Sequence, residues 1–145
     1  MVEELEMIVS GLGGEKAVGR SVHSFEDLSE AIREGFRQEA MRHLAKASGQ
    51  SLKQVSEYLN ISYRSVMRRP KTKQLPTTES DRLYRLARIV ALANHYIGDQ
   101  KRALAWLHQP NLVLGGKAPL HLIDTELGAR QVEKVLGRIA YGGVS

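Results

Sequence analysis

Most of this chain carries apolar residues at helical spacing, and this periodicity is the feature that most limits its possible folds. From residue 79 to 97, for example, Leu83, Leu86, Val90, Ala93 and Ile97 recur at intervals of three or four. The β-branched alternation typical of half-buried strands is scarce, and the four prolines lie between the periodic segments. With 42% hydrophobic residues the chain can build a packed core. The sequence therefore predicts an all-α fold.

Residues that begin and end helices stand between these segments. The predicted N-caps are Ser24, Ser51, Ser62, Asp99 and Thr125. The predicted helix ends are Gly35, Gly49, Asn60, Pro70, Gly98 and Pro110. The clearest case is 51–60, where Ser51 and Gln54 have the spacing of a capping box and Asn60 can take the left-handed conformation that ends a helix.

These predicted helix ends and connectors divide the chain into three parts. Residues 1–23 are interrupted by glycines and weakly patterned, and we expect a flexible N-terminal segment there. Residues 24–76 form a predicted helix-turn-helix DNA-binding domain that ends in a polar connector. Residues 77–145 form a predicted second helical domain, whose last helix carries Leu127, Val132, Val135, Leu136 and Ile139 on its inner face. Trp106 is expected in the core of the same domain.

The net charge of +5 is unevenly distributed along the chain. Residues 1–32 have a net charge of −5, residues 33–73 of +7, and residues 74–145 of +3. Binding to phosphates needs cations close together, because salt screens distant charges within about 8–10 Å. The concentration of positive charge in 33–73 therefore favours a nucleic-acid interface, and a solvated helical face is the alternative.

The stretch 51–69 has the pattern of a helix-turn-helix. Two short helices are joined by Asn60, Ile61 and Ser62, with Leu52, Val55, Leu59 and Val66 facing inward. In this motif the second helix enters the major groove, where arginine reads guanine and lysine mainly binds phosphate. A helical hairpin with a basic surface is the alternative. The predicted DNA-binding residues are Lys53, Gln54, Ser62, Tyr63, Arg64, Ser65, Arg68, Arg69 and Lys71, with Lys73 adding charge behind them.

The sequence offers no set of residues for catalysis or for metal binding. The five histidines have no ligand spacing, and no nucleophile, base and orienting acid occur as a group. Gly115-Gly116-Lys117 lacks the upstream glycine and the hydroxyl residue of a phosphate loop. We therefore expect no enzymatic activity, no catalytic residue, no metal and no cofactor. The absence of cysteine, of a membrane span and of a basic leader leads us to expect a cytoplasmic protein.

Two stretches carry a resemblance to a known family. The stretch LNISYRSVMRR resembles the helix-turn-helix of Xre-type antitoxins from bacterial RES–Xre toxin–antitoxin pairs, with Ser65 where the family often has threonine. The more specific likeness begins at ESDRLYRLARI, from Glu79. It continues in family order through Ala105-Trp106-Leu107, Pro110-Asn111, Leu114-Gly115-Gly116, Pro119-Leu120, Thr125-Glu126, Gly128, Val132, Leu136, Arg138-Ile139 and Tyr141-Gly142.

This resemblance implies a function in two parts. The C-terminal half would be the toxin-binding domain shared with ParS and MbcA antitoxins, and it would neutralise a RES-domain toxin that depletes NAD. The N-terminal half would bind operator DNA and repress the operon. NAD would be the toxin's substrate and not a cofactor of this chain. The partners implied are the toxin, operator DNA and further copies of the chain, as a homodimer or a larger complex with toxin, and no membrane.

The expected toxin-binding residues lie at the end of the chain and in the connection before the last helix: Leu114, Lys117, Arg138, Ile139, Tyr141 and Gly142. Tyrosine suits an interface because it offers apolar area with a polar end. The alternative is that Ile139 and Tyr141 fold back on their own core. At the level of the whole protein, the alternative is a transcriptional repressor without a toxin partner.

Overall fold

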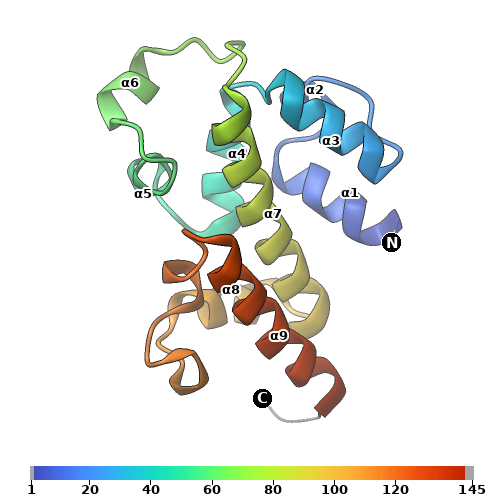
Figure 1. Cartoon of the computed structure of the whole chain (residues 1–145), viewed down its shortest axis with the longest axis vertical. Coiled ribbons are helices and arrows are strands. Elements are labelled where there is room, and N and C mark those ends of the chain that lie inside the picture. The colour runs from blue at the N-terminus through green and yellow to red at the C-terminus, as the bar shows by residue number, and fades with distance from the viewer. Residues whose placement is uncertain (1, 143–145) are drawn as a thin grey trace. The chain divides into compact units, whose positions relative to one another are not determined.

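The computed structural model describes residues 2–142 of the chain, and the side chains of residues 3–140 (Figure 1). The described residues form helices and two isolated backbone bridges, with no strand, so the predicted all-α fold is confirmed. The helices are α1 (Val2–Gly11), α2 (Glu15–Val18), α3 (Phe25–Glu34), α4 (Glu39–Ser48), α5 (Leu52–Tyr58), α6 (Tyr63–Arg68), α7 (Thr77–Ile97), α8 (Gln100–His108), η1 (Leu112–Leu114), η2 (Pro119–His121) and α9 (Glu126–Gly142).

The chain divides into two compact units, 1–87 and 88–145. The division falls within α7, which contributes its first half to unit 1 and its last ten residues, 88–97, to unit 2. The expected boundary was the polar connector before this helix, at residue 76. One continuous apolar face of α7 contributes to both cores: Leu83 and Leu86 are buried in unit 1, and Ile89 and Val90 in unit 2. The sequence therefore has no break that would mark the boundary.

The N-terminal segment differs from the expected flexible stretch. Residues 2–11 form α1, and Leu5, Ile8 and Leu12 are buried in unit 1. These three residues do have helical spacing, but Gly11, Gly13 and Gly14 follow closely and obscure the pattern. Gly13 has φ +103°, and a Cβ built there would come within 2.3 Å of the ring of His43 on α4. The missing side chain lets the turn after α1 pass close to α4.

The predicted helix caps are present. Ser24 and Asp99 accept hydrogen bonds from the backbone of Asp27 and Arg102. Ser51 and Gln54 form the complete capping box, with both bonds in place. Ser62, which begins α6, accepts from the backbone of Ser65, and Thr125 accepts from that of Gly128. Asn60 has φ +61°, the left-handed conformation predicted for the end of α5.

Unit 2 packs α8, η1, η2 and α9 around the second half of α7. Its core includes Ala93, Leu107, Ile123, Val132 and Leu136, all at most 1% exposed. Arg88 of α7 donates through Nε to Glu133 of α9 at 2.6 Å, and it also pairs with Glu126. Two expectations fail here. Leu127, predicted on the inner face, is 72% exposed on the first turn of α9, and Trp106 is half-buried at the surface and not enclosed in the core.

Candidate nucleic-acid and partner-binding interfaces

The first candidate interface is the pair α5 and α6 with the turn between them. The turn follows from two local signals, because left-handed Asn60 ends α5 and the hydroxyl of Ser62 caps α6. Ile61 donates its backbone N–H to the carbonyl of Ser56 at 3.0 Å, which closes the turn. Val55 and Val66 are buried, as predicted. This is the arrangement of a helix-turn-helix.

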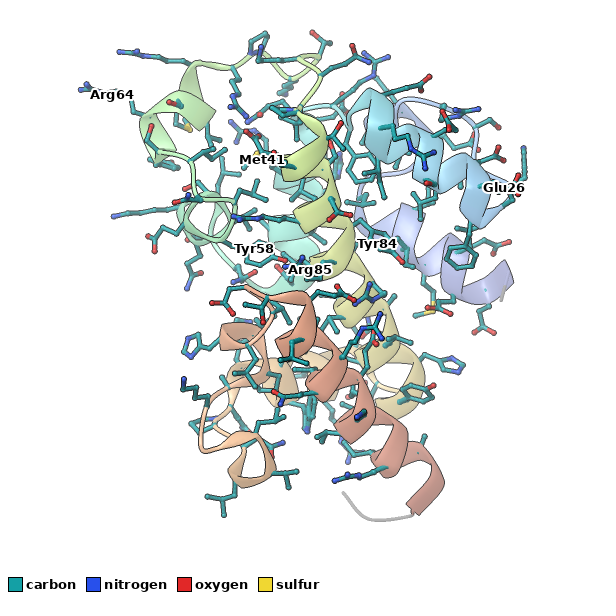
Figure 2. The ribbon with its side chains drawn as sticks, in the orientation of Figure 1. Glu26, Met41, Tyr58, Arg64, Tyr84 and Arg85 are labelled. Atoms are coloured by element: carbon teal, nitrogen blue, oxygen red, sulfur yellow. The ribbon has the colours of Figure 1, made fainter. Side chains whose placement is uncertain are left out.

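One face of α6 is fully directed to solvent. Tyr63, Arg64, Met67 and Arg68 are exposed, whereas Val66 on the opposite face is 1% exposed. Figure 2 shows Arg64 extending from α6 away from the rest of unit 1, while Met41 of α4 points into the unit. The exposed face combines two cations with a tyrosine and a methionine. It can therefore reach both phosphates and base edges. Met67 was not among the predicted contacts.

A buried glutamine holds α6 to the body of unit 1. Gln38, at the beginning of α4, is 2% exposed, and its Nε2 donates to the backbone carbonyl of Val66 at 3.3 Å. The bond joins the start of α4 to the inner face of α6. Sequence reasoning missed Gln38, because its partner lies 28 positions away along the chain. The glutamine fixes the position of the candidate recognition helix without touching a ligand.

The other predicted DNA-binding residues fall into two groups. Lys53, Lys71 and Lys73 are exposed and able to contact phosphates. Gln54, Ser62 and Ser65 are exposed too, but their side chains already form local bonds. Gln54 Oε1 accepts from the backbone N–H of Ser51 at 2.8 Å, and the Ser62 hydroxyl donates to the Ser65 hydroxyl at 2.8 Å. Their first role is therefore to cap α5 and α6.

Arg69 was predicted to contact DNA, but in the structure its side chain is paired within unit 1. Its guanidinium pairs with the carboxylate of Glu79 through two hydrogen bonds, of 2.7 and 3.2 Å. The side chains are only 17% and 10% exposed. Binding a phosphate would require this pair to break in a partly dry environment, which costs more than a surface cation gains. Arg69 therefore joins the end of α6 to the start of α7, and Arg68 is its exposed neighbour.

The connector after α6 is held in place by backbone hydrogen bonds. The carbonyls of Lys71 and Lys73 accept from the N–H groups of Glu39 and Gln38, at 3.1 and 2.8 Å. Further along, Leu75 donates to the carbonyl of Phe36 at 2.8 Å. Gly35 allows this approach, since a Cβ there would lie 2.1 Å from the carbonyl oxygen of Leu75. Lys71 and Lys73 are thus presented from a fixed connector beside α6.

The second candidate interface is in unit 2, at the connection between α8 and α9. Leu114, predicted to contact a toxin, is 8% exposed and packs toward α9. Its neighbours Leu112 and Val113 are 94% and 66% exposed, and sequence reasoning did not select them. Lys117 is exposed, as expected of a contact residue. A short 3-10 turn has no apolar periodicity, so the sequence does not show which of its three apolar residues faces inward.

The last helix carries the remaining predicted toxin contacts. Arg138 is exposed, and Ile139 is half-buried in a shallow depression that it shares with Tyr96, Ile97 and Trp106. Tyr141 and Gly142 belong to α9, but their side chains lie outside the described part of the structure. In residues 2–142, no helix is long and apolar enough to cross a membrane, and no three His, Cys, Asp or Glu residues gather as metal ligands.

Comparison with known protein families matches both units. Residues 27–88 match the antitoxin Xre-like helix-turn-helix domain, and residues 92–142 match the antitoxin Xre/MbcA/ParS C-terminal toxin-binding domain. The chain therefore carries an antitoxin Xre-like helix-turn-helix domain followed by an antitoxin Xre/MbcA/ParS toxin-binding domain. The boundary between the two matches agrees with the division of the structure within α7.

Three curated relatives support this assignment. The chain is 40% identical over 68 residues to an antitoxin Xre of Pseudomonas putida, a match that covers 47% of this chain and 43% of the relative. An antitoxin Xre of Photorhabdus laumondii is 37% identical over 70 residues, covering 46% and 47%. One of Yersinia enterocolitica is 35% identical over 65 residues, covering 44% and 44%. The chain thus matches less than half the length of these relatives.

Proposed function

We propose that this protein is the antitoxin of a type II toxin–antitoxin pair. Unit 2 binds and neutralises a RES-domain toxin, and the α5–α6 pair binds operator DNA and represses the operon. The observation that carries this proposal is the presence of both family domains in one chain. A DNA-binding domain by itself would fit many repressors. A toxin-binding domain in the same chain gives the second half of the molecule a partner.

The DNA-binding part of the proposal rests on α6 and its surroundings. Arg64 and Arg68 stand on the exposed face of the helix, and Lys53, Lys71 and Lys73 lie on neighbouring exposed segments. The arginines suit base readout in the major groove, whereas the lysines suit phosphates. We leave Arg69 out of this set because it is paired with Glu79. A single recognition helix specifies too few base pairs, so we propose that the chain binds as a homodimer or a larger assembly.

The toxin-binding part rests on unit 2 and requires no chemistry from this chain. We propose that the toxin depletes NAD and that the antitoxin blocks it by direct contact, acting as a binding protein and not as an enzyme. Surfaces available for this contact include Lys117, Arg138 and the depression beside Ile139. Arg138 is exposed on the last helix, α9, and Ile139 follows it in the depression.

The test is co-expression with a RES-domain toxin, taken from the gene next to the one that encodes this chain. We expect the antitoxin to restore growth, to preserve cellular NAD and to co-purify with that protein. The purified complex, or the antitoxin alone, should also retard a DNA fragment carrying the operon's promoter. DNA binding without rescue or co-purification would contradict the antitoxin proposal and favour a repressor that has no toxin partner.

A further inference from the structure

The connection between α8 and α9 contains a closed loop that we call the Leu112 loop, residues 111–117. Asn111 organises it. Its backbone N–H donates to the carbonyl of Lys117 at 3.1 Å, and its own carbonyl accepts from Leu114 and Gly116 at 3.0 and 2.9 Å. Its side-chain Oδ1 accepts from the N–H of Val113 at 2.9 Å. These bonds close the loop on itself, and we take it to be rigid.

The rigid loop separates its apolar residues between core and solvent. Leu114 anchors it against α9, at 8% exposed, while Leu112 and Val113 point outward at 94% and 66%. A single exposed leucine needs no explanation. The Leu112 loop differs from that case, because it exposes two adjacent apolar side chains. Its backbone hydrogen bonds prevent the loop from turning these side chains inward. The backbone that carries them is already held in one conformation, so that binding costs little loss of backbone entropy.

The surroundings of the loop indicate the chemistry of the partner. Val113 and Leu114 line a depression together with Lys134 and Arg138 of α9, and Lys117 ends the loop. Among the described residues, no carboxylate lies within ion-pair distance of these three cations. The nearby acidic side chains Glu126 and Glu133 are instead bonded to Arg88. The surface therefore combines the exposed apolar side chains of the loop with cations from the loop and from α9.

We propose that the Leu112 loop is an anchor that inserts Leu112 and Val113 into an apolar pocket of the toxin, where acidic residues around the pocket meet Lys117, Lys134 and Arg138. This inference rests on the proposed function, because the occupant is the toxin bound by unit 2. It adds a docking surface separate from the chain terminus. An apolar side chain that fills a partner's pocket at the centre of an interface contributes binding energy, and the complementary charges around it contribute specificity and association rate.

The experiment measures the affinity of the full chain for the RES-domain toxin used in the co-expression test, by titration calorimetry. We expect Leu112→Ser with Val113→Ser to weaken binding by at least about tenfold, since two central anchors are lost. The matched control is Leu127→Ser, which removes an equally apolar side chain that is 72% exposed in the same unit but outside the loop. The control should bind within about threefold of the unmodified chain.

A second pair of variants tests the charged rim. Lys134→Glu with Arg138→Glu should weaken binding, and this loss should shrink at high salt. Lys46→Glu with Lys101→Glu, the same change in charge at two exposed lysines outside both candidate toxin surfaces, should have little effect. All the substituted side chains are exposed, and circular dichroism and thermal melting will show whether the variants fold. If the doubly substituted loop binds as tightly as the unmodified chain, the anchor is wrong although the antitoxin function stands. If the unmodified chain itself does not bind, the proposed function fails, and this inference with it.

Discussion

The guanidinium of Arg69 and the carboxylate of Glu79 form a two-bond ion pair, with distances of 2.7 and 3.2 Å, between the end of α6 and the start of α7. This ion pair gives Arg69 a different role from its neighbour Arg68. Arg68 is exposed and able to reach DNA, whereas Arg69 fixes the helix that carries it.

This relationship predicts opposite effects for the two arginines. Arg69→Ala leaves the carboxylate of Glu79 without its partner in a site where it is 10% exposed, and we expect a loss of roughly 2 kcal/mol in the free energy of unfolding. Arg68→Ala should leave stability within about 0.5 kcal/mol and weaken DNA binding. Urea denaturation and gel-shift titration measure the two effects. A fully stable Arg69→Ala variant with weakened DNA binding would return Arg69 to the DNA interface.

Arg64 is expected to read a base. It projects from the exposed face of α6, and Arg64→Ala should reduce discrimination between the operator and unrelated DNA by ~1–3 kcal/mol. The measurement is gel-shift titration against the native promoter and a scrambled fragment. Arg42→Ala, an exposed arginine of α4, serves as the control. An unchanged ratio of the two affinities in the Arg64 variant would remove this residue from the base contacts.

DNA binding should depend steeply on salt. Five exposed cations surround the recognition helix: Lys53, Arg64, Arg68, Lys71 and Lys73. If four or five of them contact phosphates, the slope of log affinity against log salt will be about −4. Replacing Lys71 and Lys73 together by Ala should reduce its magnitude by about 2. A slope near zero for the unmodified protein would mean that this cluster does not contact DNA.

Neutralisation of the toxin should depend on the end of the chain. Deleting residues 139–145 is expected to abolish protection in co-expression and to leave DNA binding measurable, because the deleted part lies beyond unit 1. Tyr141→Ala should weaken protection less, since one aromatic anchor is worth ~2 kcal/mol when central. Growth and cellular NAD are the readouts. Full protection by a folded, truncated chain would show that the contact lies elsewhere, with the Leu112 loop as the next site to test.

Unit 1 should lose stability in acid through two carboxylates. The backbone N–H of Val22, with help from the Ser21 hydroxyl, holds the pKa of Glu15 below its ordinary value of 4.5. The backbone N–H of His23 likewise lowers the pKa of Asp27 below 3.8. A pKa lowered by folding stabilises the fold above the unfolded value, and this contribution disappears as the pH falls through the folded pKa.

The melting temperature should therefore fall as the pH drops from about 5 through the lowered pKa values of these groups. Glu15→Gln with Asp27→Asn should flatten this part of the profile, whereas Glu26→Gln, an exposed neighbour for which no backbone bond is seen, should not. Calorimetry across this pH range makes the comparison. A doubly substituted variant with the same acid profile as the unmodified chain would contradict the assignment to these two groups.

The sequence by itself determined the helical class, most helix boundaries and the location of the basic helix-turn-helix. The helix boundaries depend on residues that act on backbone groups only a few positions away, such as Ser51 with Gln54, Asn60 and Ser62. Short stretches of sequence are therefore enough to predict them. The surplus of cations in 33–73 is likewise a property of composition. These local signals suffice because helices form from contacts between near neighbours.

The tertiary structure decided which of the candidate residues are exposed and which are bonded within the fold. Arg69 and Arg68 are equivalent in the sequence, and only the structure shows that Glu79, ten positions on, pairs with Arg69. Gln38 holds α6 through a bond that spans 28 positions. In the Leu112 loop, three consecutive apolar residues have no helical periodicity, and the backbone bonds of Asn111 determine that Leu114 is buried while Leu112 is exposed. The exposure and pairing of these residues depend on atoms that are distant in the sequence and come together only through packing. A local sequence pattern therefore cannot predict them.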